Sequence, residues 1–313
     1  MEEKVKYKLL FSDLDHTLLV DHHIPPFNLE AIKQMKEKGV KFVICTGRPL
    51  KLVKSFLKEL NTENSENEYT ICNSGITIYE NKNEKLIYFK GIDYETAQLV
   101  LEFGKKFKGI SISFSTFDGS FIYKNEKEKE EKVEETEETE EIEEKEEKEK
   151  KEEKEKKEEK GKKHRGRKMM GFKFKRNFIK SLDEIKNSQI IIILINSKDP
   201  DNLLNVVNEI NKDERLKGKI SCFKSGSKML EIHSFGVCKG EALKWLSNYL
   251  KVDIKETIAI GDDFNDENML KEAGLGCCVK SAHDDIKKVA KYICEKDYFE
   301  GSVKEIIDKF ILN

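Results

Sequence analysis

The chain of 313 residues lacks the usual sequence signals of secretion, membrane insertion and disulfide bonding. Its longest apolar run, Ile190 to Ile195, is far shorter than the roughly 18 residues that a bilayer-spanning helix needs. Its first residues do not place a basic segment before an apolar one, as a signal peptide does. The 7 cysteines form no CxxC pair and lie mostly in apolar runs, which is typical of reduced thiols. These absences favour a cytoplasmic protein with no membrane partner.

The chain also lacks a strong overall charge, since its net charge is −2 at pH 7. This value hides one uneven tract, Glu126 to Lys160, which holds 20 Glu and 11 Lys and leaves the rest of the chain mildly basic. A mild and dispersed positive charge fits a small anionic substrate and argues against nucleic acid as a partner. Because this tract has almost nothing to bury, residues 126–168 are predicted to be a disordered surface insertion.

Apolar runs alternate with helix-like spacing at both ends of the chain. Near the N-terminus this pattern predicts buried strands at Leu9–Phe11, Val40–Cys45 and Tyr69–Asn73, with helices between them. The same rhythm returns after Gly240, whereas the middle of the chain mixes helices with hairpin-like strands. We therefore expect an α/β fold, with a Rossmann-like, doubly wound parallel sheet as the core (residues 1–80 and 234–313) and an inserted α+β cap (residues 81–233).

Polar clusters follow predicted strands, and in an open parallel sheet such loops gather at one edge. The clusters are Asp13-Leu-Asp15-His-Thr17, Thr46-Gly47-Arg48, Lys239-Gly240 and Gly261-Asp262-Asp263-Phe-Asn265-Asp266. Several carboxylates in one pocket repel each other at neutral pH, and a hard cation removes that conflict. Mg²⁺ prefers carboxylate, water and phosphate oxygens, so Asp13 and Asp262 are its natural side-chain ligands.

The same clusters contain the groups that phosphoryl transfer requires. A carboxylate such as Asp13 beside Mg²⁺ is a competent nucleophile toward phosphorus. Asp15 can protonate the leaving oxygen and then activate water. Lys239 offers a fixed positive charge to the phosphoryl oxygens, and the Thr46 hydroxyl and Gly47 amide offer hydrogen-bond donors. The sequence therefore predicts a magnesium-dependent enzyme that transfers phosphoryl groups.

These clusters, in this order, resemble the haloacid dehalogenase superfamily. The opening Asp-x-Asp-x-Thr matches its hydrolases, and the α+β insert between Thr46 and Lys239 resembles the C2-type cap of the Cof-type branch. The run Glu231-Ile-His-Ser-Phe-Gly-Val-Cys-Lys239-Gly240 and the loop Gly-Asp-Asp-Phe-Asn-Asp-Glu-Asn-Met resemble two further segments of that branch. The resemblance covers nearly the whole chain except the charged tract.

The resemblance implies a role for each matching residue. Asp13 matches the nucleophile, Asp15 the general acid/base with its main-chain carbonyl on the metal, Asp262 the Mg²⁺ ligand and Asp266 a supporting acidic group. The phosphate-binding positions are matched by Thr46, Gly47, Lys239 and Asn265, and Arg48 lies where it could contact substrate. His16 replaces the glycine most common at its position, and Ser74-Gly75 replaces Asn-Gly. Neither departure is expected to change the chemistry.

Three functions are compatible with this set of residues. The favoured one is a phosphatase of small phosphorylated metabolites, with sugar phosphates as the preferred class and an aspartyl-phosphate intermediate. A phosphomutase of the phosphomannomutase type would share the opening motif. A regulatory binding protein that uses the fold as a scaffold would be expected to lose one of the acidic or basic residues, and Asp13, Asp15, Lys239 and Asp262 are all present.

Overall fold

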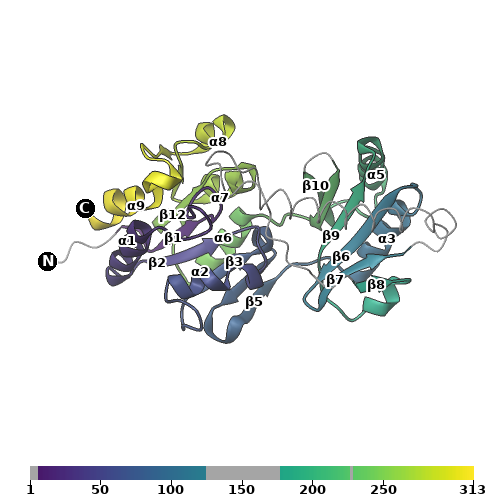
Figure 1. The fold of residues 1–313 in the computed structure, drawn as a ribbon, viewed down its shortest axis with the longest axis horizontal. Coiled ribbons are helices and arrows are strands. Elements are labelled where there is room, and N and C mark those ends of the chain that lie inside the picture. The colour runs from purple at the N-terminus through teal and green to yellow at the C-terminus, as the bar shows by residue number, and fades with distance from the viewer. Residues whose placement is uncertain (1–5, 125–176, 226–227) are drawn as a thin grey trace, which may run out of the picture. The chain divides into compact units, whose positions relative to one another are not determined.

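The computed structural model describes residues 6–124, 177–225 and 228–313, so the insertion predicted at 126–168 lies outside the described residues. The chain divides into two units (Figure 1). Unit 1 comprises Met1–Ile92, Lys217–Ser221 and His233–Asn313, and unit 2 comprises Asp93–Leu216 and Cys222–Ile232.

Unit 1 is built on an eight-stranded sheet with the order β14-β13-β12-β1-β2-β3-β4-β5. The strands from β14 to β3 are parallel to their neighbours, and β4 and β5 continue the sheet in antiparallel fashion. The strands are β1 (Leu9–Ser12), β2 (Lys41–Cys45), β3 (Tyr69–Cys72), β4 (Thr77–Glu80), β5 (Lys85–Phe89), β12 (Thr257–Gly261), β13 (Leu275–Cys278) and β14 (Tyr292–Ile293).

Helices accompany this sheet in the crossover positions that parallel strands require. They are α1 (Pro26–Glu37), α2 (Lys54–Glu59), α6 (Lys239–Tyr249), α7 (Glu267–Glu272), α8 (Asp284–Val289) and α9 (Ser302–Ile307). Helix α1 packs against α9, and α6 packs against α7. Every residue of β1 and β12 is buried, as expected of central strands that are covered on both faces.

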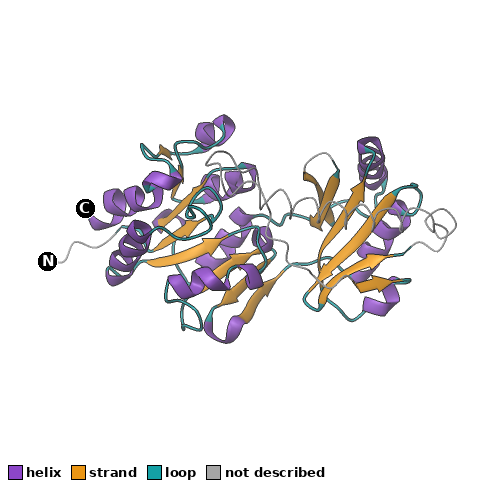
Figure 2. Cartoon of the chain, in the orientation of Figure 1, coloured by secondary structure: helices purple, strands orange, loops and turns teal. Residues whose placement is uncertain are grey.

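Unit 2 contains a six-stranded sheet with the order β10-β11-β9-β6-β7-β8. Its elements are α3 (Tyr94–Gly104), β6 (Ile110–Thr116), β7 (Gly119–Tyr123), β8 (Asn177–Ile179), β9 (Ile190–Ser197), α5 (Pro200–Lys212), β10 (Ile220–Ser225) and β11 (Met229–Ser234). Helices α3 and α5 pack against each other and against β9. Figure 2 shows each sheet with its helices. The predicted fold class, an α/β core with an inserted α+β unit, is confirmed.

The predicted boundary between core and cap at residue 81 is wrong, because β5 belongs to the core sheet. Strand β5 pairs with β4 across a short turn, with Thr77 opposite Phe89 and Glu80 opposite Lys85, and unit 2 begins only at Asp93. A hairpin strand can extend either a core sheet or a cap sheet, and its own sequence does not say which. The pairing partner decides this, and that partner is β4.

Candidate active site

Three of the four predicted clusters meet because their strands are neighbours. The order β12-β1-β2-β3 places the loops after these strands side by side at the carboxyl edge of the sheet. Asp13 follows β1, Thr46 follows β2 and Asp262 follows β12. Lys239 is the first residue of α6, whose N-cap is Cys238.

The ammonium group of Lys239 lies between two carboxylates. Its Nζ donates to Asp13 Oδ1 at 2.5 Å and to Asp266 Oδ1 at 2.6 Å. The side chains of Lys239 and Asp266 are fully buried, and that of Asp13 is 9 % exposed. Burial alone would lower the pKa of Lys239, but the charges of Asp13 and Asp266 raise it, so the side chain is an ammonium ion.

Asp266 also holds the loop that carries Asp262. Its Oδ2 accepts the main-chain N–H groups of Asp262 at 3.0 Å and Asp263 at 3.2 Å. This arrangement requires a glycine at position 261, because a Cβ there would lie 2.3 Å from Asp266 Cγ. Asp266 therefore joins the acidic loop to Lys239 through direct hydrogen bonds. The sequence predicted only a supporting acidic group near the metal.

Thr17 is a site residue to which sequence reasoning assigned no role. Its hydroxyl donates to Asp262 Oδ1 at 2.9 Å and so fixes the orientation of that carboxylate. The threonine of the opening motif was the available signal, but its partner lies 245 positions further along the chain. Only the adjacency of β1 and β12 reveals the pair.

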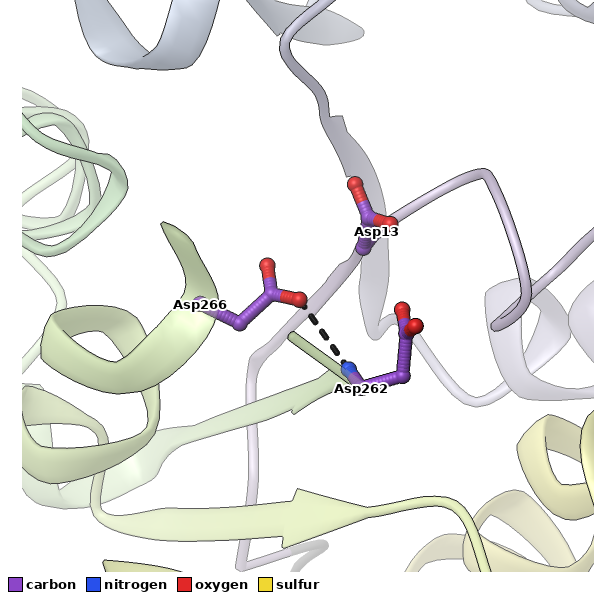
Figure 3. Close-up of side chains that lie close together, drawn as sticks. All are labelled: Asp13, Asp262 and Asp266. Carbon is purple, nitrogen blue, oxygen red and sulfur yellow. Dashed lines mark hydrogen bonds between the residues drawn. The ribbon is translucent and has the colours of Figure 1, made fainter. Parts of the chain in front are cut away.

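The carboxylates of Asp13, Asp262 and Asp266 form an acidic group that could hold a metal ion (Figure 3). Each offers one oxygen, and the three oxygens lie within 4.8 Å of one another. Burial raises the pKa of Asp13 to about 7 despite Lys239, which lowers it. Burial and the charges of Asp13 and Asp266 raise the pKa of Asp262 to about 8.

The charge of this group suits a divalent cation. With all three carboxylates ionised, the group and the Lys239 ammonium together carry a net charge of −2 in a partly buried place. Hard oxygen donors with free lone pairs are the ligands that Mg²⁺ prefers. The donor set therefore fits the predicted Mg²⁺.

Asp15 and Arg48 form a two-pronged ion pair. Arg48 Nε donates to Asp15 Oδ2 at 2.9 Å, and Arg48 Nη2 donates to Asp15 Oδ1 at 2.5 Å. The Asp15 side chain is 48 % exposed, so it remains accessible from solvent. Sequence reasoning expected Arg48 to contact substrate and did not foresee its pairing with Asp15.

The Thr46 cluster is held by main-chain bonds to the loop after β3. Thr46 is buried, and its Oγ1 accepts the N–H of Arg48 at 3.2 Å. The carbonyls of Thr46 and Arg48 accept the N–H groups of Ser74 and Asn73 at 3.0 and 3.1 Å. Gly47 lies next to Ser74, whose Oγ would be 3.3 Å from a Cβ at position 47.

Asn265 is exposed on the turn Phe264–Asp266, outside the hydrogen-bonded group of Asp13, Lys239 and Asp266. His16 is exposed as well and adopts a φ of 57°, in the left-handed region that glycine occupies without strain. The backbone conformation thus explains why glycine suits this position.

Comparison with known proteins identifies the family. The family model described as haloacid dehalogenase-like hydrolase matches residues 10–307. The chain belongs to this family. The predicted family is therefore confirmed.

Relatives of this haloacid dehalogenase-like hydrolase match it along most of its length. Phosphatase YwpJ of Bacillus subtilis is 25% identical over 310 residues, covering 90% of this chain and 93% of its own. The 5-amino-6-(5-phospho-D-ribitylamino)uracil phosphatase YcsE of the same organism is 25% identical and covers 97% and 96%. A haloacid dehalogenase-like hydrolase from Bacteroides thetaiotaomicron superposes with a TM-score of 0.69 at 25% identity, covering 97% of this chain and 99% of its own.

These matches also support the predicted enzyme class, a phosphatase of this family. Over residues 6–124, 177–225 and 228–313, the structure contains no helix that is both long and apolar enough to cross a membrane.

Proposed function

We propose that this hydrolase is a Mg²⁺-dependent phosphatase of small phosphorylated metabolites, with sugar phosphates as the preferred class, acting through an aspartyl-phosphate intermediate. The observation that carries the proposal is the environment of Asp13. Its carboxylate lies at the carboxyl end of a central strand, 2.5 Å from the Lys239 ammonium and within the acidic group of Asp262 and Asp266.

Asp13 and Asp262, with the main-chain carbonyl of Asp15, would hold the Mg²⁺ ion. When bound, the ion would neutralise part of the negative charge that carboxylates and a phosphoryl group bring together. Asp266 would support these ligands without binding the ion itself, since its oxygens already accept hydrogen bonds from Lys239 and from two main-chain N–H groups. Thr17 would keep Asp262 oriented.

The chain's own residues account for both halves of the reaction. In the first, a carboxylate oxygen of Asp13 attacks phosphorus, the bond from phosphorus to the ester oxygen breaks, and Asp15 donates a proton to that oxygen. In the second, Asp15 takes a proton from water, the water oxygen attacks phosphorus, and phosphate leaves while the Asp13 carboxylate is restored. Lys239, Thr46, Gly47 and Asn265 would supply positive charge and donors to the phosphoryl oxygens.

Arg48 adds a requirement to this scheme. Both carboxylate oxygens of Asp15 accept hydrogen bonds from the Arg48 guanidinium, so both are turned toward Arg48 rather than toward a substrate. Asp15 must therefore leave Arg48, at least in part, before it can protonate the leaving oxygen. Substrate contact by Arg48, as the sequence suggests, would free it.

The name of one relative supports the proposal of a small substrate with a sugar-like portion. YcsE is named for a phosphorylated ribityl compound, in which the phosphate is carried by a sugar alcohol. The mildly basic remainder of the chain is consistent with an anionic small molecule.

The decisive experiment is an assay of phosphate release from a panel of sugar phosphates, with Mg²⁺ and with excess chelator. We expect turnover with Mg²⁺ only. Ca²⁺ should inhibit, because its larger and looser coordination shell disturbs the attack geometry. Full turnover in chelator would contradict the metal requirement. Isomerised sugar phosphate appearing without free phosphate would favour the phosphomutase instead.

A further inference from the structure

Aromatic side chains follow four neighbouring strands of the core sheet at its carboxyl edge. His16 comes after β1, Phe264 after β12, His283 after β13, and Tyr298 and Phe299 after β14. The strands stand in the order β14-β13-β12-β1, so these loops are consecutive along the edge. We call these five residues the aromatic rim. Thr46 and Arg48 lie on the opposite side of β1, after β2.

The rim residues contact one another in two groups. His16 meets Tyr298 edge-on with ring centroids 5.5 Å apart, and Tyr298 meets Phe299 at 5.3 Å. Phe264 and His283 have ring centroids 4.4 Å apart. The loops that carry these groups are tied together, because Ser281 Oγ donates to Asp297 Oδ1 at 2.6 Å.

The rim is also attached directly to the acidic group. The main-chain N–H of His283 donates to the Asp262 carbonyl at 3.2 Å. Thr17, the residue after His16, donates to Asp262 Oδ1 at 2.9 Å. Phe264 lies two positions after Asp262 in the same loop. The loops that carry the rim therefore adjoin the loop of the acidic group, on the side of β1 away from Thr46.

Much of the aromatic rim is open to solvent. Phe264 is 52% exposed and Phe299 is 53% exposed, and both histidines are exposed. In addition, the imidazole of His16 is carried by a backbone with a φ of 57°, a conformation that disfavours any residue with a Cβ. Strained backbone and exposed aromatic rings at the ligand edge of a sheet together suggest a function rather than packing.

We propose that the aromatic rim is a binding subsite for a planar heterocycle, so that the preferred substrate is a sugar phosphate that carries such a ring, as a nucleoside monophosphate does. The inference rests on the proposed function for the position of the phosphate at Asp13. Flat heteroaromatic rings stack on phenylalanine, tyrosine and histidine with little regard to their hydrogen-bonding groups. The rim selects a class of leaving group, and the acidic group performs the chemistry.

The test compares two substrates that share a sugar and a phosphate and differ only in the ring. These are adenosine 5′-monophosphate and ribose 5-phosphate. The wild-type enzyme should show the higher kcat/KM for the nucleotide. Phe264→Leu and Phe299→Leu keep an apolar side chain but remove the ring, and each should lower the ratio of the two kcat/KM values about fivefold or more, mainly through the KM of the nucleotide.

Tyr249→Leu is the matched control, because Tyr249 is an aromatic residue of unit 1 that is 47% exposed and lies outside the rim. It should leave the ratio unchanged. A wild-type enzyme that hydrolyses ribose 5-phosphate but does not favour the nucleotide would overturn the subsite while sparing the proposed function. An equal loss on both substrates in the two phenylalanine variants would indicate a structural role and would overturn it as well.

A binding measurement decides the matter even if neither compound is hydrolysed, which would count against the proposed function. Saturation-transfer difference spectra should show transfer to the base protons of adenosine 5′-monophosphate with the wild-type protein and weaker transfer with Phe264→Leu. Equal transfer to the base protons in both proteins would overturn the subsite.

Discussion

Lys239 is the residue on which the charge of the site depends. It is fully buried, and it is the ammonium that contacts both Asp13 and Asp266. Replacing it by methionine keeps the length of the side chain but leaves two buried carboxylates without that partner. Removing one member of a buried ion pair typically costs about 3–5 kcal/mol. We therefore expect Lys239→Met to lose turnover and to lower the free energy of unfolding by that amount in urea denaturation.

Lys244 provides the matched control for this change. It lies on the same helix, and its side chain is 38% exposed beside Glu241 and Glu272. Because exposed ion pairs contribute less than about 1 kcal/mol, Lys244→Met should change stability little. Adding Asp266→Asn to Lys239→Met should recover part of the lost stability, since one stranded charge is removed. Equal stability of Lys239→Met and Lys244→Met would contradict this account.

Asp13 and Asp15 should differ in how their loss depends on the leaving group. Asp13→Asn removes the proposed nucleophile, and the loss of a nucleophile typically costs about 10⁴-fold or more in turnover. Its loss should be similar for an aryl phosphate and for a sugar phosphate. Asp15→Asn removes the proposed proton donor, which should matter less for an aryl phosphate, because the aryl leaving oxygen is a weak base. Single-turnover rates of both variants on both substrates measure the difference.

Substantial activity in Asp13→Asn would contradict the aspartyl-phosphate mechanism and favour direct attack by water. Asp15→Asn would also weaken the ion pair between Asp15 and Arg48. The folding of each variant should therefore first be checked by thermal denaturation.

Asp13 and Asp262 could be predicted to lie together because each stands directly after an apolar strand, and parallel strands bring such positions to one edge. Asp266 was expected near them only from the family resemblance, and Lys239 begins helix α6 rather than following a strand of the core sheet. The partners of Asp15 and Asp262 could not be predicted, since Arg48 and Thr17 reach them across loops from other strands. A sequence pattern records which strand a residue follows, but not where its side chain points.

At the scale of elements, the loop after β3 connects the Thr46 cluster to helix α6. Residues Asn73, Ser74 and Gly75 all have positive φ, at 51°, 56° and 98°. Gly75 packs so closely on α6 that a Cβ would lie 2.4 Å from the carbonyl oxygen of Cys238. Since Lys239 follows Cys238, this contact bears on the position of the ammonium group.

Gly75→Ala should therefore lower both stability and turnover. Gly39→Ala is the control that measures only the stability cost of the left-handed backbone conformation. Gly39 has a φ of 80° and open space around the position of a Cβ. The left-handed conformation alone costs about 1–2 kcal/mol in a residue with a Cβ. We expect Gly39→Ala to lose about that much and Gly75→Ala to lose more, as measured by urea denaturation. Equal losses would show that the loop moves away from α6 without cost.

Elements were predicted best where their neighbours follow directly from the chain order. The parallel strands β1, β2, β3 and β12 were expected from short apolar runs between helices, and the structure contains them. Strand β5 was assigned to the cap because hairpin strands dominate the middle of the chain. Its pairing with β4 depends on a contact with the core, which alternation of apolar residues along β5 cannot reveal.

At the scale of the whole molecule, the acidic group should link folding to pH and to the proposed Mg²⁺ ion. The pKa values of Asp13 and Asp262 are raised in the folded protein from 3.8 to about 7 and about 8. The metal-free folded state therefore binds more protons than the unfolded chain between about pH 4 and pH 8, so these two groups make stability fall as the pH rises through this range. Below pH 4 both states are protonated and the effect ends.

The proposed Mg²⁺ ion should oppose this loss, because it would bind the ionised carboxylates and displace their protons. We expect the melting temperature of the metal-free protein to fall between pH 6 and pH 8, and the increase caused by Mg²⁺ to be larger at pH 8 than at pH 6. A ligand at 100 times its Kd stabilises by about 2.7 kcal/mol, which gives the size of the effect expected at such a Mg²⁺ concentration. The control is Asp13→Asn combined with Asp262→Asn, which should show a shallower pH dependence and no response to Mg²⁺. If the wild-type and double-variant proteins respond alike to pH and to Mg²⁺, the acidic group is not the metal site.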